Sequence, residues 1–450
     1  MTSPTHPAPG FLHRGLTHLA LLSAALFLAA CGSEPDDGSS STTGPEEEPA
    51  TGVAAHCAPD DDGLALPDGF CAVVVHEGLG RARHLAVASN GDIVVALADG
   101  REEAGGVAVL RDTDGDAQAD SVARFGEVGG NDVLLTEAGL WFAADDRILR
   151  YPWTEGATTP SGGPVTVVSG LPDIRNHTAK SIALDGSGGL FVNIGSPSNA
   201  CMEEARTQGS PGMDPCPELE TRAGIWRFDA GATGQGPADG TLWATGVRNA
   251  VALATTPDGA LYGVVHGRDQ LHGMFPDRYT VADNTEKPAE EFVRLDEGTD
   301  IGWPYCYHDP ETGQKLLAPE YGGEGTEVGR CADKDMPIIG FPAHWAPNDL
   351  AFYTGSSFPA RYQGGAFIAF HGSWNRAPNP QEGFRVVFVP ADGTGFGTEW
   401  DTFADGFRDP DNPGASDSAR PVGLDVGPDG SLYVSDSVRG RIWRIVPEGG

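Results

Sequence analysis

One short motif, two apolar strands joined by a glycine-centred turn, occurs six times along the chain. The copies are ASNGDIVVA (88–96), TEAGLWFAA (136–144), DGSGGLFVN (185–193), TPDGALYGV (256–264), RYQGGAFIAF (361–370) and GPDGSLYVS (427–435). Turn glycines followed by alternating aliphatic and aromatic residues are typical of β-hairpins. Six hairpins with no helical period between them predict an all-β fold built from repeated sheets.

A six-bladed β-propeller of four-stranded antiparallel blades accounts best for this spacing, with a β-sandwich as the main alternative. The segment GFCAVVVHEGL (69–79) is placed to complete the last blade beside RIWRIVP (441–447). Such closure removes the exposed sheet edges that invite aggregation. We therefore predict one propeller domain over residues 57–450. The longest gap between turn glycines runs from Gly259 to Gly365, and its loops are expected to form part of the active site.

The first residues have the features of an export signal. His13 and Arg14 precede an apolar run that ends in Leu28-Ala29-Ala30-Cys31, which predicts a lipoprotein signal peptide over 1–30 with cleavage before a lipidated Cys31. An ordinary secretory signal is the alternative. Residues 31–56 lack apolar periodicity and predict a flexible acidic linker. The expected location is the bacterial cell envelope, on the outer membrane by analogy, with the lipid as the only membrane contact.

The charge of the chain excludes one class of partner. The formal net charge is -35 at pH 7, so a polyanion would be repelled, and we expect no nucleic-acid binding. A small neutral substrate meets no such barrier.

Six cysteines besides Cys31 fall into neighbouring couples. The couples are Cys57 with Cys71, Cys201 with Cys216, and Cys306 with Cys331. An even number in an exported chain suggests three disulfides, although the sequence permits about fifteen pairings and only adjacency favours this one. The chain has no CxxC spacing, which argues against a zinc site or a thiol redox site.

An acidic loop, DTDGDAQAD (112–120), has the spacing of an EF-hand. Its aspartates occupy the first, third, fifth and ninth positions, but the twelfth is Ala123 in place of the usual glutamate. The aspartates are Asp112, Asp114, Asp116 and Asp120. A structural calcium site and a solvated acidic hairpin both remain open.

Several strings resemble the soluble pyrroloquinoline-quinone (PQQ) sugar dehydrogenases, most closely the sorbosone and pyranose dehydrogenase-like branch. They are NHTAKSIALDGSGGLFVNIGSPSNAC, TGVRNAVALA, VHGRDQL, GTDIGWPYC, HWAPNDLAFYTG, FHGSWNR and RPVGLDVGPDGSLYVSD, spread over residues 66–446. The resemblance implies a quinoprotein that oxidises a sugar or related aldehyde with PQQ and Ca²⁺, and in such enzymes the cofactor carries the redox chemistry.

The resemblance implies His177 as the general base, since a neutral imidazole can accept a hydroxyl proton near neutral pH. A capping or surface histidine is the alternative. Sugar-oxidising relatives orient this histidine with an aspartate, whereas the matching position here is near Ser196. A hydroxyl cannot stabilise an imidazolium as a carboxylate does, so glucose as the substrate is in doubt.

The tricarboxylate cofactor needs forked cationic donors, which arginine supplies. The resemblance implies that Arg248 and Asn249 lie against the quinone oxygens and that Arg248 stabilises the charge that develops there. Further candidates for cofactor or substrate contacts are Arg376, Arg420, Trp374 and Lys180, with His344 and His371 of lower rank. Inter-blade ion pairs are the alternative for the two arginines, and core packing is the alternative for the tryptophan.

The resemblance also implies that backbone carbonyls of Gly267 and Arg268 hold the calcium ion, with Asp269 supporting the loop. Electrons would pass to a separate acceptor, a cytochrome or a quinone, because the chain has no CxxCH haem-attachment motif. Two other functions stay open: a calcium-dependent lactonase-like hydrolase, and a non-catalytic surface propeller that binds a glycan or a protein.

Overall fold

Six four-stranded antiparallel sheets make up the computed structural model, which describes residues 63–448 except 102, 175, 394 and 409–417. The first sheet contains β2 (Ala82–Val87), β3 (Ile93–Leu97), β4 (Gly106–Arg111) and β5 (Ser121–Phe125), and the second contains β6 (Gly130–Thr136), β7 (Gly139–Ala144), β8 (Ile148–Tyr151) and β9 (Val165–Val168). The third contains β10 (Ile182–Leu184), β11 (Gly189–Ile194), β12 (Gly224–Asp229) and β13 (Thr241–Thr245), and the fourth contains β14 (Ala252–Thr255), β15 (Leu261–Val265), β16 (Glu290–Arg294) and β19 (Ile339–Phe341). The fifth contains β20 (Pro347–Phe352), β21 (Ala366–Phe370), β22 (Arg385–Val389) and β23 (Asp401–Ala404), and the sixth contains β24 (Pro421–Val426), β25 (Leu432–Asp436), β26 (Ile442–Pro447) and β1 (Phe70–His76).

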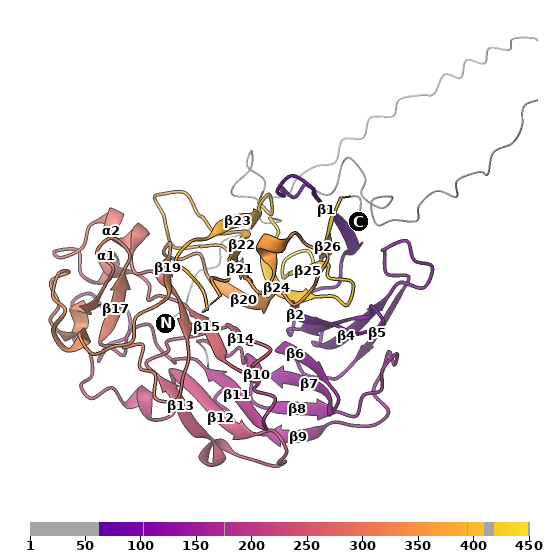
Figure 1. Ribbon diagram of the computed structural model, residues 1–450. Helices are drawn as coiled ribbons and strands as arrows, with labels where there is room; N and C mark the ends of the chain where they lie inside the picture. Colours follow the sequence, from indigo (N-terminus) through magenta and orange to yellow (C-terminus); the bar gives the residue numbers. More distant parts are fainter. Residues whose placement is uncertain (1–62, 102, 175, 394, 409–417, 449–450) are drawn as a thin grey trace, which may run out of the picture. The chain divides into compact units, whose positions relative to one another are not determined.

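The first strand of each sheet faces a common axis. These inner strands contact one another in the closed order β2, β6, β10, β14, β20, β24 and back to β2, and Figure 1 shows them around the centre. The fold is therefore a six-bladed β-propeller, as the sequence predicts, and the sandwich is excluded. The predicted closure is also confirmed, because β1 pairs antiparallel with β26, with Val73 opposite Arg444.

Each of the six sequence motifs ends in the second strand of a blade and covers the residues just before it. In five blades these residues form a turn from the inner strand, whereas in the fifth blade residues 353–365 make a longer connection. The apolar residues of these strands fill the spaces between blades. Between the fifth and sixth blades the core is largely aromatic, with Phe358, Tyr362, Phe367 and Phe403 buried together. Their edge-to-face and stacked contacts strengthen packing beyond the area that they bury.

Carboxylates on three of the inner strands join their blade to the next one. Asp132 Oδ2 accepts a hydrogen bond from the Ile182 amide at 2.8 Å, and Asp349 Oδ2 accepts one from Leu424 at 2.7 Å. Asp425 Oδ2 accepts from Val87 at 2.7 Å, which joins the last blade to the first.

The same axial carboxylates surround a buried histidine. His84 Nδ1 lies 3.1 Å from Asp132 Oδ1 and 3.7 Å from Asp349 Oδ1. Both aspartates are thus engaged by protein groups at the axis.

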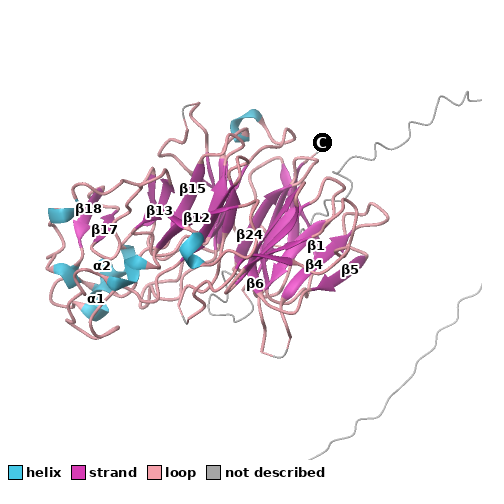
Figure 2. Cartoon of the chain, turned by 90° about the horizontal axis from the view of Figure 1, so that it is seen from below, coloured by secondary structure: helices cyan, strands magenta, loops and turns pink. Residues whose placement is uncertain are grey.

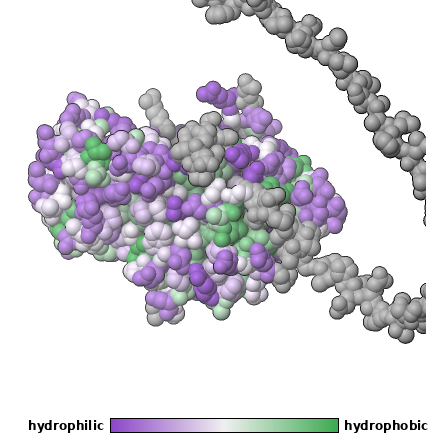
Figure 3. Space-filling model, turned by 90° about the horizontal axis from the view of Figure 1, so that it is seen from above, coloured by the Kyte–Doolittle hydropathy of each residue, from purple (hydrophilic) through white to green (hydrophobic). Residues whose placement is uncertain are grey.

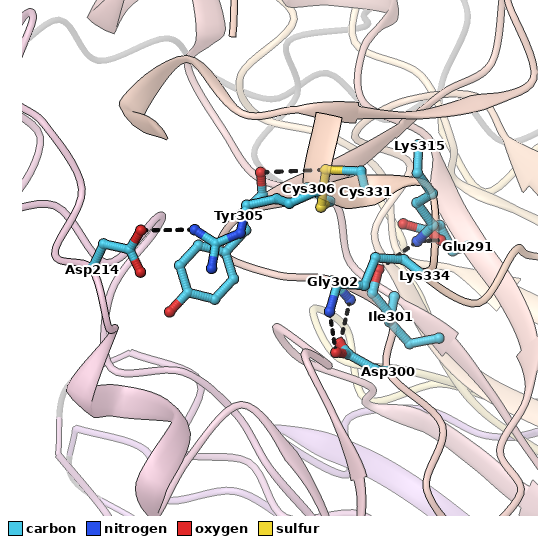
Figure 4. Close-up of a disulfide and its surroundings, with 11 residues drawn as sticks. Asp214, Glu291, Asp300, Ile301, Gly302, Tyr305, Cys306, Lys315, Cys331 and Lys334 are labelled. Carbon is cyan, nitrogen blue, oxygen red and sulfur yellow. Dashed lines mark hydrogen bonds and ion pairs between the residues drawn. A yellow bond between two sulfur atoms is a disulfide. The ribbon is translucent and has the colours of Figure 1, made fainter. Parts of the chain in front are cut away.

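The fourth blade carries the main insertion, which extends from one side of the propeller (Figure 2). Helices α1 (Leu271–Met274) and α2 (Val281–Glu286) lie between β15 and β16, and a hairpin of β17 (Cys306–Asp309) and β18 (Gln314–Leu317) lies between β16 and β19. The Cys201–Cys216 and Cys306–Cys331 disulfides are present, which confirms two predicted pairs. Figure 4 shows the second of them. Cys57 lies outside the described residues, so its pairing with Cys71 stays a prediction.

The predicted signal peptide, Cys31 and the acidic linker also lie outside the described residues. Among the residues that are described, none of the helices combines the length and apolarity needed to cross a bilayer. Hydrophilic side chains dominate the face drawn in Figure 3, in keeping with the acid-rich composition.

Candidate active site

A cavity of about 400 Å³ opens at the end of the propeller axis where loops lead into the inner strands. It is within the usual range for a small-molecule site. Seven residues named from the sequence line it: His177, Arg248, Asn249, Gly267, Asp269, Trp374 and Arg420. They come from separate loops, so the propeller brings together side chains that are far apart along the chain. The lower-ranked His344 and His371 line it as well.

The imidazole of His177 has a defined tautomer. Its Nδ1 lies 2.8 Å from the Ser196 carbonyl oxygen and 3.1 Å from Ser196 Oγ. The Ser196 hydroxyl donates its own proton to the Ser198 carbonyl at 2.6 Å. Both oxygens of Ser196 therefore act as acceptors, so Nδ1 carries the hydrogen and Nε2 keeps the lone pair.

The surroundings also keep this imidazole neutral. Burial, reinforced by the positive charge of Arg248, lowers the pKa of His177 to about 3. A histidine with that pKa is unprotonated at neutral pH, as a general base must be before it accepts a proton. The sequence placed Ser196 beside His177, and the structure shows that contact.

Gly195 allows the close packing behind His177. A Cβ atom at this position would lie 2.5 Å from His177 Cβ and 2.7 Å from Asn249 Oδ1, closer than van der Waals contact permits. His177 itself has a φ of 52°, a left-handed conformation that costs a β-carbon-bearing residue about 1 kcal/mol or more. The positions of His177 and Asn249 thus depend on a glycine between them.

Arg248 and Asn249 are held rigidly from behind. The Arg248 guanidinium, which is buried, donates from Nε to the Asn199 carbonyl at 3.2 Å and from Nη2 to Asp269 Oδ2 at 3.2 Å. Asn249 Oδ1 accepts a hydrogen bond from Asn193 Nδ2 at 3.0 Å. Their orientation is therefore fixed before any ligand binds.

Two carboxyl groups in the cavity have opposite protonation. Burial raises the pKa of Glu290 to about 8, although it accepts hydrogen bonds from the Gly267 and Ala346 amides. Burial alone would raise the pKa of Asp269, but the positive charges of Arg248 and Arg206 help to outweigh it and lower that pKa. At neutral pH, Glu290 is protonated and Asp269 is ionised.

Other cavity residues were not singled out from the sequence. They are Asn176, Asn199, Arg206, Val251, His266, Glu290, Ala346, Asn348, Gly372 and Asn375. His266 and Asn375 lie within motifs already quoted, next to Gly267 and Trp374 respectively. That adjacency is the sequence signal that could have identified them. No sequence signal marks Glu290, because it lies within a strand and only the folded structure directs its side chain toward the cavity.

Three residues named from the sequence have side chains away from the cavity. Lys180 Nζ donates to the carbonyl oxygens of Pro172, at 2.8 Å, and Thr178. The Arg376 guanidinium donates to the Thr285 carbonyl at 2.9 Å and pairs with Glu286. These cations hold the loops around the cavity and do not line it.

Arg268 is the third such residue. Its guanidinium forms a buried bidentate pair with Glu320, with nitrogen–oxygen distances of 2.5 and 2.6 Å. Its side chain thus anchors the segment after β15. The backbone carbonyls of Gly267 and Arg268 as calcium ligands stay a prediction.

Trp374 lies at the mouth of the cavity and is 63% exposed, the most exposed tryptophan among the described residues. The sequence alternative of core packing is therefore excluded. Arg420 also lines the cavity, and its guanidinium donates to the Gly372 carbonyl at 3.2 Å.

The acidic loop lies far from this cavity in the hairpin between β4 and β5. Carboxylate oxygens of Asp112, Asp114 and Asp116 lie within 4.8 Å of one another. Asp120 instead accepts hydrogen bonds from the Thr113 amide and hydroxyl at 2.6 and 2.7 Å. The calcium site and the solvated hairpin both stay open.

Comparison with known proteins gives a family match over the whole propeller. The model of the TrAA12-like family matches residues 64–448. A PQQ-dependent pyranose dehydrogenase from Coprinopsis cinerea is 25% identical over 235 residues, which are 46% of this chain and 31% of that protein. An uncharacterized protein from Borreliella burgdorferi is 30% identical over 210 residues, 46% of this chain and 48% of that protein. The matches thus span less than half the length of either relative.

Solved structures share the fold. A Trichoderma reesei protein of carbohydrate-active enzyme family AA12 superposes with a TM-score of 0.70 at 20% identity, over 86% of this chain and 98% of that one. The PQQ domain of Coprinopsis cinerea pyranose dehydrogenase, in its holo form, gives 0.68 at 20% identity, over 85% and 97%. At these identities the likeness establishes the six-bladed architecture.

Proposed function

Because the chain belongs to the TrAA12-like family, we propose that it is a PQQ-dependent oxidoreductase that oxidises a sugar at a C–OH group. The substrate class is an aldose, a pyranose or a sorbosone-like aldehyde. One observation carries the proposal: a neutral histidine with a lone pair on Nε2 shares a cavity with three guanidinium groups.

The charges in the cavity suit a tricarboxylate cofactor. Arg206, Arg248 and Arg420 line it, and Asp269 is the ionised carboxylate among the described lining residues because Glu290 is protonated. The cavity is thus cationic within a chain whose net charge is -35. A trianion with planar carboxylates gains forked hydrogen bonds from arginine there.

His177 supplies the base. Its Nε2 accepts the hydroxyl proton of the sugar, and the Ser196 oxygens that bind Nδ1–H stabilise the ring as it becomes charged. A bound quinone would supply the acceptor for the hydride from the carbon that bears this hydroxyl. Arg248 and Asn249 donate hydrogen bonds toward developing negative charge, and their fixed positions avoid a reorganisation cost.

Calcium completes the proposal. Carbonyl oxygens of Gly267 and Arg268 suit a hard cation, and the Glu290 and Glu320 contacts hold this segment in place. Trp374 offers an aromatic surface to the sugar or the cofactor at the mouth of the cavity.

We also propose that the protein works outside the cytoplasm, tethered by a lipid on Cys31. Electrons would then pass to a separate acceptor, a cytochrome or a quinone.

The test is to purify the full chain, titrate it with PQQ in the presence of Ca²⁺ by absorbance, and screen sugars with a dye acceptor. We expect stoichiometric binding and sugar-dependent dye reduction. Arg248→Ala is expected to weaken PQQ binding, whereas Arg361→Ala, which removes an exposed pair with Asp401 on the fifth blade, should not. If protein that circular dichroism shows to be folded binds no PQQ, the proposal is wrong and the surface-binding and hydrolase alternatives gain weight.

A further inference from the structure

Asn199 was not among the site residues named from the sequence, yet it contacts candidate catalytic groups directly. Its backbone carbonyl accepts a hydrogen bond from Arg248 Nε at 3.2 Å, and its Oδ1 accepts one from Arg248 Nη2 at 3.0 Å. The two acceptors match the fork of the guanidinium and fix both its position and its plane. Asn199 itself is only 4% exposed.

The same side chain also binds the segment that follows β15. Asn199 Oδ1 accepts from the Asp269 amide at 2.8 Å, and Asn199 Nδ2 donates to the Asp269 carbonyl at 2.8 Å. This two-way pairing resembles one step of a β-ladder. It joins Arg248 to the backbone immediately after Gly267 and Arg268.

The position of Asn199 is set by the insertion. Trp303 Nε1 donates to the Asn199 carbonyl at 3.0 Å, and Cys201, two residues further on, is fixed by its disulfide to Cys216. Trp303 precedes Cys306, whose disulfide to Cys331 is drawn in Figure 4.

The two disulfide-closed loops are themselves joined. Arg330 pairs with Asp214 at 2.7 Å and stacks over the Tyr305 ring at 4.0 Å. The Tyr305 hydroxyl accepts a hydrogen bond from the Cys216 amide at 2.8 Å. Asn199 thus stands between a cross-linked scaffold and the cavity.

We propose that Asn199 is a positioning residue that holds the Arg248 guanidinium and the Gly267–Asp269 segment in a single geometry. The expected effect on catalysis rests on the function proposed above. The expected effect on the position of Arg248 does not, because it applies to the protein without cofactor. Loss of the Asn199 side chain removes one of the acceptors of Arg248 and both hydrogen bonds to the Asp269 backbone.

The first experiment uses cofactor-free protein and the arginine reagent phenylglyoxal, with peptide mass spectrometry to locate the modified residues. Buried Arg248 should be protected in the wild type and should react in Asn199→Ala about as fast as the more exposed Arg206. Arg420 serves as an internal control, because its guanidinium is held by the Gly372 and Ser373 carbonyls and not by Asn199. Continued protection of Arg248, or an equal rise at Arg420, would overturn the proposal.

The second experiment measures turnover of PQQ-loaded variants. We expect Asn199→Ala to lower kcat by about 10²-fold with a smaller change in KM, because displacing a charge-stabilising group acts mainly on the transition state. Asn199→Asp keeps an acceptor for Arg248 and should restore its protection from phenylglyoxal. Should Asn199→Ala fail to fold, Asn199→Asp and Trp303→Phe give the comparison.

Glu203→Ala is the matched control, because Glu203 is an exposed residue of the same disulfide-closed loop and is not part of the links that hold Asn199. It is expected to leave kcat and the reactivity of Arg248 unchanged. Equal losses in Glu203→Ala and Asn199→Ala would assign the effect to the loop as a whole and overturn the specific role. Failure of the wild type to bind PQQ would refute the proposed function, while the phenylglyoxal result would still decide the geometry.

Discussion

His177 Nδ1 lies 2.8 Å from the Ser196 carbonyl oxygen, and this contact fixes which ring nitrogen can accept a proton. A carbonyl can only accept, so Nδ1 must donate and Nε2 is the basic atom. In place of the carboxylate that relatives are expected to carry, the histidine has two neutral oxygens. A neutral partner stabilises the imidazolium less than a carboxylate does, which favours a weaker base that stays unprotonated.

Replacing His177 with alanine should abolish most turnover and leave PQQ bound. Removing a general base typically costs at least about 10²-fold in rate, whereas the cationic groups of the cavity stay in place. Dye reduction and absorbance titration measure the two properties separately. His76→Gln, on the outermost strand β1 of the sixth blade, is the control. Turnover retained by the His177 variant would remove this residue from the mechanism.

The protonation state of His177 gives a second prediction. Because burial and Arg248 lower its pKa to about 3, cofactor-free protein should show the neutral Nδ1–H tautomer from pH 8 down to about 5 by ¹⁵N NMR. In urea the same ring should titrate near its ordinary value of about 6.5. The folded state thus binds this proton less readily than the unfolded state, so this histidine destabilises the fold as pH falls below about 6.5. A folded-state titration near 6.5 would contradict the deduced environment.

Gly195→Ala tests the packing behind the histidine. The added Cβ would come within 2.5 Å of His177 Cβ and 2.7 Å of Asn249 Oδ1, so both side chains must shift. A displacement of about 1 Å is expected to cost about 10²-fold in kcat. Gly163→Ala, which meets no atom within 4 Å, is the matched control. Wild-type kinetics in the Gly195 variant would mean that this region adapts easily.

The sequence predicted structure best where the residues that form an element are close neighbours in the chain. Each glycine-centred hairpin needs only neighbouring residues to form, and the pairing of β1 with β26 follows from counting strands. His177 and Arg248 were predicted from the family resemblance. The structure brings both to one cavity because each precedes an inner strand, β10 and β14 respectively.

Side-chain direction could not be read in the same way. Lys180 is close to His177 in the chain, but its ammonium turns to the Pro172 and Thr178 carbonyls, because those acceptors are supplied only once the loop folds. Arg376 similarly satisfies carbonyls of α2 and its surroundings. In the opposite sense, Glu290 is an ordinary strand residue in the sequence, and only the packing of β16 makes it a buried, protonated cavity group.

The contact between Asp425 and the Val87 amide gives a prediction about stability. Asp425→Ala would leave that partly buried amide without its acceptor between the last and first blades, which costs about 1 kcal/mol. Burial raises the pKa of Asp425 to about 6, above its unfolded value of about 3.9. Its protonated form therefore stabilises the fold at low pH, and this contribution is lost as pH rises from about 4 to about 6. Urea denaturation should show the difference in unfolding free energy between wild type and variant growing as pH falls through that window. Exposed Asp68→Ala is the control, and a difference independent of pH would show that Asp425 is ionised throughout.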